Sequence, residues 1–66
     1  MLRNLKAEMV RANVKADDLA ALIGVKRKTI DNKIAQRSDF SFAEAVSIRD
    51  AYFPDAQLEY LFTPTT

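Results

Sequence analysis

The residues of this sequence that are best suited to binding a ligand are three consecutive cations, Lys26, Arg27 and Lys28. They closely follow Gly24, the only glycine of the chain. Ammonium and guanidinium groups bind phosphate, and the planar fork of arginine matches the O6 and N7 acceptors of guanine. Asn32, one helical turn further on, carries an amide that matches N6 and N7 of adenine. The group indicates binding to a polyanion with exposed base edges, although a run of cations is also typical of a solvated helix face.

The composition argues against catalysis. The chain has 66 residues and contains neither cysteine nor histidine, so it lacks disulfides, thiolate metal ligands and the usual general base. Asp17 and Asp18 are its only adjacent carboxylates, and the dipole of an expected helix explains them. We expect no enzymatic activity, no cofactor, no metal and no small-molecule substrate. Apolar runs are far shorter than the roughly 20 residues of a membrane span, so we expect no membrane partner and a cytoplasmic location.

Charge is distributed unevenly along the chain. Residues 1–37 carry nine Lys or Arg against four Asp or Glu, whereas residues 38–66 carry one Arg against five acids. The formal net charge of +1 hides this division. The pattern indicates one side that faces a polyanion and another side with a different role, although chance produces such unevenness in small domains as well.

Apolar residues recur at intervals of three and four, which is the period of one helix face, and no segment alternates like a strand. We therefore expect a single all-α domain over residues 1–66, with a tail at 63–66. The expected helices cover about residues 2–12, 16–24, 27–35, 42–52 and 56–61.

Local signals define the ends of these helices. Asn13 and Gly24 tolerate the left-handed backbone that follows many helices. Ser41 and Glu44 have the spacing of a capping box and predict the start of the fourth helix. Pro54 ends that helix, because proline cannot continue the hydrogen-bond ladder.

The segment Leu19-Ala20, Gly24-Val25 and Ile30 resembles the motif of the Cro and repressor family, the lambda-repressor-like (XRE-like) DNA-binding domains, and the similarity covers residues 2 to 62. It implies a compact bundle of five short helices with a helix-turn-helix at about 16–35. It also implies sequence-specific binding to double-stranded DNA, with the third helix in the major groove of a phage-type operator, and a role as a transcriptional repressor.

The resemblance implies roles for the polar residues in and near the third helix by their family position. It makes Arg27, Lys28 and Asn32 the base-reading residues. The residues expected at the phosphates are Lys26, Thr29, Lys33 and Arg37. Phosphate contacts of this kind fix position and make binding sensitive to salt, but they carry little sequence information.

Three positions depart from the family pattern. Ala16 stands where a phosphate-clamping glutamine is common, and Lys26 stands where a capping Ser or Thr is common. Lys33 stands at a usually apolar core position, so the third helix is expected to be rotated or shifted. An alternative is therefore a protein-interaction module that keeps this fold without binding DNA.

A homodimer is expected, because a single module covers only about 600–1,000 Å² of DNA and two copies on a near-palindrome double the footprint. The aromatic-rich last third of the chain offers a candidate dimer surface, with core packing as the alternative role for its side chains. This candidate surface consists of Tyr52, Phe53, Tyr60, Leu61 and Phe62.

Overall fold

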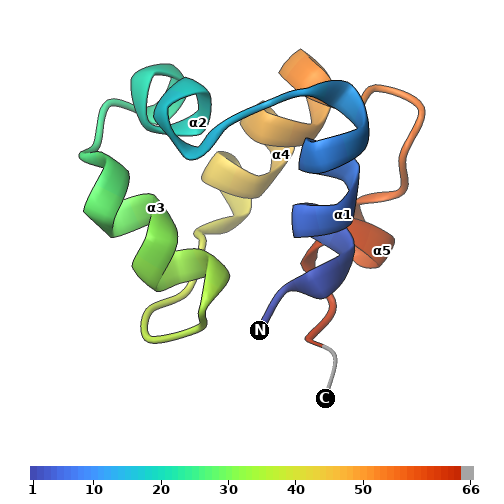
Figure 1. The fold of residues 1–66 in the computed structure, drawn as a ribbon. Helices are drawn as coiled ribbons and strands as arrows, with labels where there is room; N and C mark the ends of the chain where they lie inside the picture. The colour runs from blue at the N-terminus through green and yellow to red at the C-terminus, as the bar shows by residue number, and fades with distance from the viewer. Residues whose placement is uncertain (65–66) are drawn as a thin grey trace.

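The computed structural model describes residues 1–64 and contains five α-helices in that range, which confirms the all-helical prediction (Figure 1). Their bounds are α1 Arg3–Ala12, α2 Ala16–Ile23, α3 Arg27–Ile34, α4 Phe42–Tyr52 and α5 Leu58–Phe62. The Cα radius of gyration is 10.4 Å. A folded chain of this length is expected to have about 10.8 Å, so the helices form one closely packed body.

The ends of the helices follow the local signals. Asn13 and Gly24 have left-handed backbone, with φ of 55° and 73°. The Ser41 hydroxyl accepts the Glu44 N–H at 3.1 Å, and the Glu44 carboxylate accepts the Ser41 N–H at 2.9 Å. This reciprocal pair is the expected capping box of α4. A third left-handed residue, Gln36 with φ of 65°, follows α3 and was not foreseen.

Each helix contributes one large side chain that is completely buried. These five residues meet in the centre of the molecule and are Leu5, Leu19, Ile30, Ile48 and Leu61. A helix of eight residues is too short to be stable alone in water, so packing on this shared core supports it.

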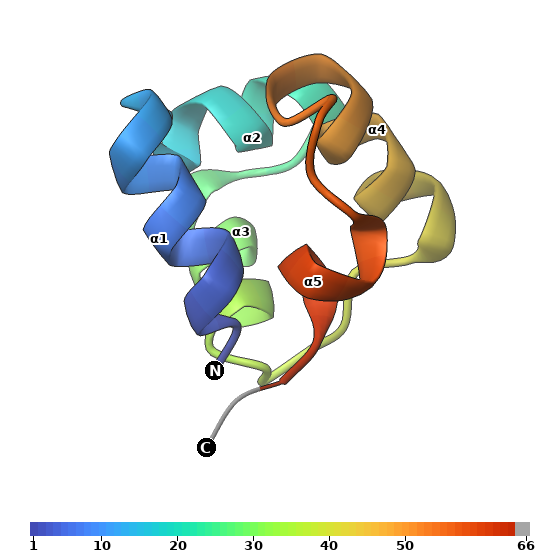
Figure 2. The same ribbon diagram turned by 90° about the vertical axis from the view of Figure 1, so that its right-hand side faces the viewer.

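α1 and α5 lie side by side, which both views show (Figures 1 and 2). The Asn4 amide donates to the backbone carbonyl of Tyr60 at 2.9 Å, and the Tyr60 hydroxyl donates to Glu8 at 3.0 Å. The bond to the Glu8 carboxylate raises the pKa of Tyr60, because it stabilises the protonated hydroxyl. The first and last helices are thereby joined. α3 lies at an edge of the body in Figure 1.

Several expectations need correction. α3 ends at Ile34 rather than at residue 35, and the last helix begins at Leu58 rather than at residue 56. In the aromatic-rich segment, Phe53 and Leu61 are buried in the core and are not available to a dimer surface. Of the expected tail, residues 63 and 64 follow α5 without helical structure, and residues 65 and 66 lie outside the described part.

No helix within residues 1–64 combines the length and the apolar character that crossing a bilayer requires.

Candidate nucleic-acid interface

The turn between α2 and α3 directs the start of α3 away from the core. The N–H of Gly24 and that of Val25 both donate to the carbonyl of Ala20, and Lys26 has extended backbone as the N-cap of α3. Ile30 and Ile34 bury the inner face of α3, which packs mainly on α2. The first turn of α3 therefore presents its other side to solvent.

Lys26 and Lys28 are exposed at this first turn, and no ion pair joins either of them to another residue in 1–64. Their ammonium groups are free to approach a phosphate or a base edge. The predicted contact with DNA requires access first, and the placement of both lysines provides it.

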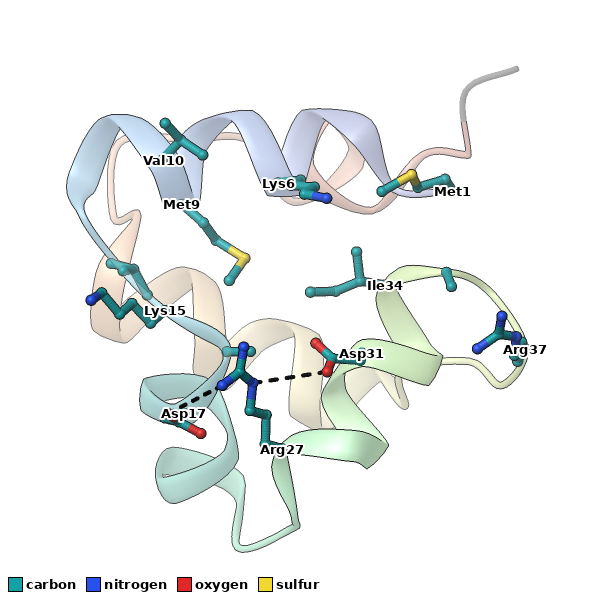
Figure 3. Close-up of a pocket in the computed structure, with 13 residues that line it drawn as sticks. Met1, Lys6, Met9, Val10, Lys15, Asp17, Arg27, Asp31, Ile34 and Arg37 are labelled. Carbon is teal, nitrogen blue, oxygen red and sulfur yellow. Dashed lines mark ion pairs between the residues drawn. The ribbon is translucent and has the colours of Figure 1, made fainter.

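Arg27 has a different environment from its two neighbours. Its guanidinium lies 3.9 Å from the carboxylate of Asp17 in α2 and 3.9 Å from that of Asp31 in α3. Figure 3 shows the side chain extending between these two acids into the space that α1 closes on the opposite side. The Arg27 side chain is 66% exposed, so water screens both pairs and their strength is small. Arg27 has to leave this position to read a base, at a small cost.

An open cleft of about 560 Å³ separates α1 from α2 and α3, and Arg27 lines it (Figure 3). Met9 and Val14 give it an apolar wall, while Lys6 and Lys15 add positive charge at its edge. Arg27 joins the cleft to the cationic first turn of α3, and the cleft lining combines apolar side chains with cations and the carboxylates of Asp17 and Asp31.

The remaining predicted residues of α3 are less available. Asn32 is half-buried, and its side-chain oxygen accepts a bond from Arg37 at 3.2 Å. Bidentate reading of adenine requires both ends of the amide, so this bond competes with it. Thr29 is half-buried, and Arg37 is exposed just beyond the helix. Arg37 keeps the access that a phosphate contact requires.

Lys33, which was expected at a phosphate, is paired with protein groups. Its Nζ donates to Glu44 of α4 at 2.8 Å and to the backbone carbonyl of Asp39 at 3.1 Å, and it lies 5.6 Å from the centre of the Phe40 ring. Its side chain is only 14% exposed. Because the ammonium is bonded to these protein acceptors, the predicted phosphate contact requires Lys33 to leave them.

Lys33 lies at the border of the core. Ile30 and Ile34 are both buried and the Lys33 side chain is mostly covered, so the aliphatic part of the lysine covers apolar surface while its charged end reaches polar partners. Bonds from Lys33 and from the Ser41 backbone lower the pKa of Glu44 below its usual value, because both favour the charged carboxylate.

Sequence reasoning missed the acidic neighbours of the cations. The spacing of Arg27 and Asp31 by four residues was a usable signal, since such pairs are adjacent on a helix. Asp17 and Glu44 gave no comparable signal, because each lies on a helix other than that of its partner.

Among residues 1–64, no group of three or more potential ligands is placed to hold a metal ion.

Comparisons of the chain with protein-family models, with curated proteins and with solved structures found no match.

Proposed function

We propose that this protein binds double-stranded DNA sequence-specifically and acts as a transcriptional repressor of the Cro and repressor type. The observation that carries the proposal is the arrangement of α3. Ile30 and Ile34 fix its inner face, while its first turn presents three consecutive cations to solvent. The short turn at Gly24 joins α2 to this helix, and this order supports the proposed helix-turn-helix.

In the proposed mechanism α3 enters the major groove by its N-terminal end. Lys28 and Arg27 contact base edges, and each good bidentate contact discriminates by about 1–3 kcal/mol. Lys26 and Arg37 bind phosphates on the two sides of the groove and set the register of the helix. Asn32 adds a base contact once it releases Arg37.

A homodimer is part of this proposal, since one domain covers a small footprint. Tyr60 of the candidate surface proposed from the sequence is 41% exposed, and Phe42 at the start of α4, which was not part of that set, is 76% exposed and joins the candidates. Sedimentation equilibrium with and without a palindromic duplex tests whether two copies bind together. A one-to-one complex at every concentration contradicts the dimer.

Selection of bound sequences from random duplexes tests the function directly. We expect an enriched motif, with two half-sites about one helical turn apart if two copies bind. The double variant Arg27→Ala/Lys28→Ala should lose selectivity while its circular dichroism stays helical. A protein that binds no duplex, or that binds with no dependence on salt, contradicts the proposal.

One observation favours a second function, that of a protein-interaction module. Asp17 and Asp31 flank Arg27 with negative charge, and the adjacent cleft has an apolar wall. An amphipathic peptide fits such a surface as well as a phosphate backbone does. If Arg27→Ala/Lys28→Ala leaves association with a protein partner and regulation in cells unchanged, this second function is favoured over DNA reading.

A further inference from the structure

Lys33 is the least exposed ion-paired cation of the structure, and the DNA-binding mechanism does not use it. It belongs to the last turn of α3, whereas its partners Asp39, Phe40 and Glu44 belong to the following loop and to α4. We call these four residues the Lys33 cluster.

The Lys33 cluster links the end of α3 to the capping box at the start of α4. The Glu44 carboxylate accepts both the ammonium of Lys33 and the backbone N–H of Ser41, which begins α4. The same ammonium holds the carbonyl of Asp39, two residues before Ser41. One lysine therefore fixes the end of α3 to the loop and to the start of α4.

Contacts with α2, with α1 and with the N-terminal segment also hold α3. α3 packs mainly on α2 and touches α1 to a smaller extent, and the N–H of Leu2 donates to the carbonyl of Ile34 at 2.9 Å. The side-chain hydrogen bonds that the structure describes between α3 and the following segment are those of Lys33 to Asp39 and Glu44 and that of Arg37 to Asn32. A helix that enters a groove has to be held at a defined angle, because small displacements at a binding site are costly.

We infer that Lys33 is a positioning residue for the DNA-reading helix: through Glu44 and Asp39 it sets the angle of α3 on the body, and it does not touch DNA itself. This inference rests on the proposed function. It assigns to Lys33 an effect on affinity and selectivity that passes entirely through the orientation of Arg27 and Lys28.

The salt dependence of binding separates a positioning residue from a phosphate ligand. Losing a phosphate ligand reduces the slope of log affinity against log salt by about 0.9. Lys33→Ala should weaken specific binding by at most about fivefold, which is the population shift that losing a pair worth up to about 1 kcal/mol allows if the pair holds α3 in its binding orientation, and it should leave the slope at the wild-type value. Lys26→Ala is the matched control, because this exposed lysine should lower the slope.

Glu44→Gln gives a second test whose two outcomes have opposite sign. The amide still accepts the Ser41 N–H but no longer carries the charge that holds Lys33. If Lys33 positions α3, the variant binds DNA more weakly, although it has lost an acidic group. If Lys33 is a phosphate ligand that Glu44 holds back, the variant binds more tightly and its slope increases.

Lys33→Met keeps the inference testable if Lys33→Ala unfolds, because it retains the aliphatic part that covers apolar surface and removes the charged end. A folded Lys33→Met variant should bind its specific duplex more weakly while the slope stays at the wild-type value. Unchanged affinity in this folded variant overturns the positioning role.

The outcomes for the two proposals are distinct. If the wild-type protein binds no duplex at all, the proposed function fails and the inference falls with it. If the wild type binds and Lys33→Ala lowers the slope by about 0.9, only the inference fails. If wild type and Lys26→Ala behave as expected and Lys33→Ala loses affinity at constant slope, the inference is supported.

Discussion

The two ends of α3 each carry a cation close to carboxylates, and the two environments differ. Arg27, at the start, is 66% exposed and lies 3.9 Å from Asp17 and from Asp31. Lys33, in the last turn, is 14% exposed and lies 2.8 Å from Glu44. Water screens the charges at the first end more strongly than at the second, where both side chains are less exposed and the atoms are closer, so a similar pairing of charges has different strength. The first cation is free to move to a new partner, and the second is fixed in place.

This difference assigns complementary roles to the two ends. A side chain that reads a base has to exchange protein partners for DNA, which a weak, exposed pair permits. A side chain that orients the helix has to keep its partners throughout binding, which requires a short and shielded pair. Ile30 lies between the two ends and is completely buried, so the comparison depends on its packing.

The largest expected effect on stability comes from truncating Ile30, whose packing supports both ends of α3. Ile30→Ala should lower the free energy of unfolding by about 2–5 kcal/mol, because it leaves a cavity in the centre of the core. Urea denaturation followed by circular dichroism measures the loss. Lys28→Ala, on the exposed side of the same helix, is the control and should change stability by no more than about 0.5 kcal/mol. Similar losses for both variants contradict the assignment of inner and outer faces.

A smaller effect is expected at the turn that leads into the first end. Gly24→Ala should cost about 1 kcal/mol of stability, since φ is 73° and a side chain is strained there. No atom lies within 4 Å of an added Cβ, so the cost comes from the backbone and not from a clash. Gly24→Asn, measured by the same denaturation, should lose less because asparagine tolerates this conformation better. Equal losses contradict this explanation.

Acidification tests the pair of Lys33 and Glu44 at the C-terminal end of α3. The pKa of Glu44 is lowered from its ordinary value of 4.5, first by the hydrogen bond from Lys33. A lowered pKa means that the stabilisation is fully present above 4.5 and disappears as the pH falls through the lowered value. The wild type should therefore be more stable than Glu44→Gln at neutral pH, and the difference should shrink on acidification. Denaturation at pH 7 and near pH 3 measures it, and a constant difference counts against the pair.

The smallest effect on stability is expected for the pair of Arg27 and Asp31 at the N-terminal end of α3. Asp31→Asn should change the free energy of unfolding by less than about 0.5 kcal/mol, because its pair with Arg27 is long and exposed. The same denaturation experiment, repeated at low and high salt, measures the change. A loss larger than that of Glu44→Gln would reverse the comparison between the two ends of α3.

Much of the fold could be predicted because its signals are local. Asn13 and Gly24 ended helices through their own backbone preferences, and Ser41 with Glu44 began α4 through bonds within one turn. The bounds were less certain where no such residue stands, as at the start of α5. The access of Lys26 and Lys28 was also predictable, since Ile30 and Ile34 set which face turns inward.

The sequence by itself determined the five helices, the inner face of α3 and the concentration of cations at its start, since each depends on residues within a turn or two of one another. Only the tertiary structure decided which cations are available. Asp17 reaches Arg27 from another helix, and Glu44 reaches Lys33 across a loop. The energy of a charge depends on its distance from partners and on the water around it, and the fold alone sets both quantities.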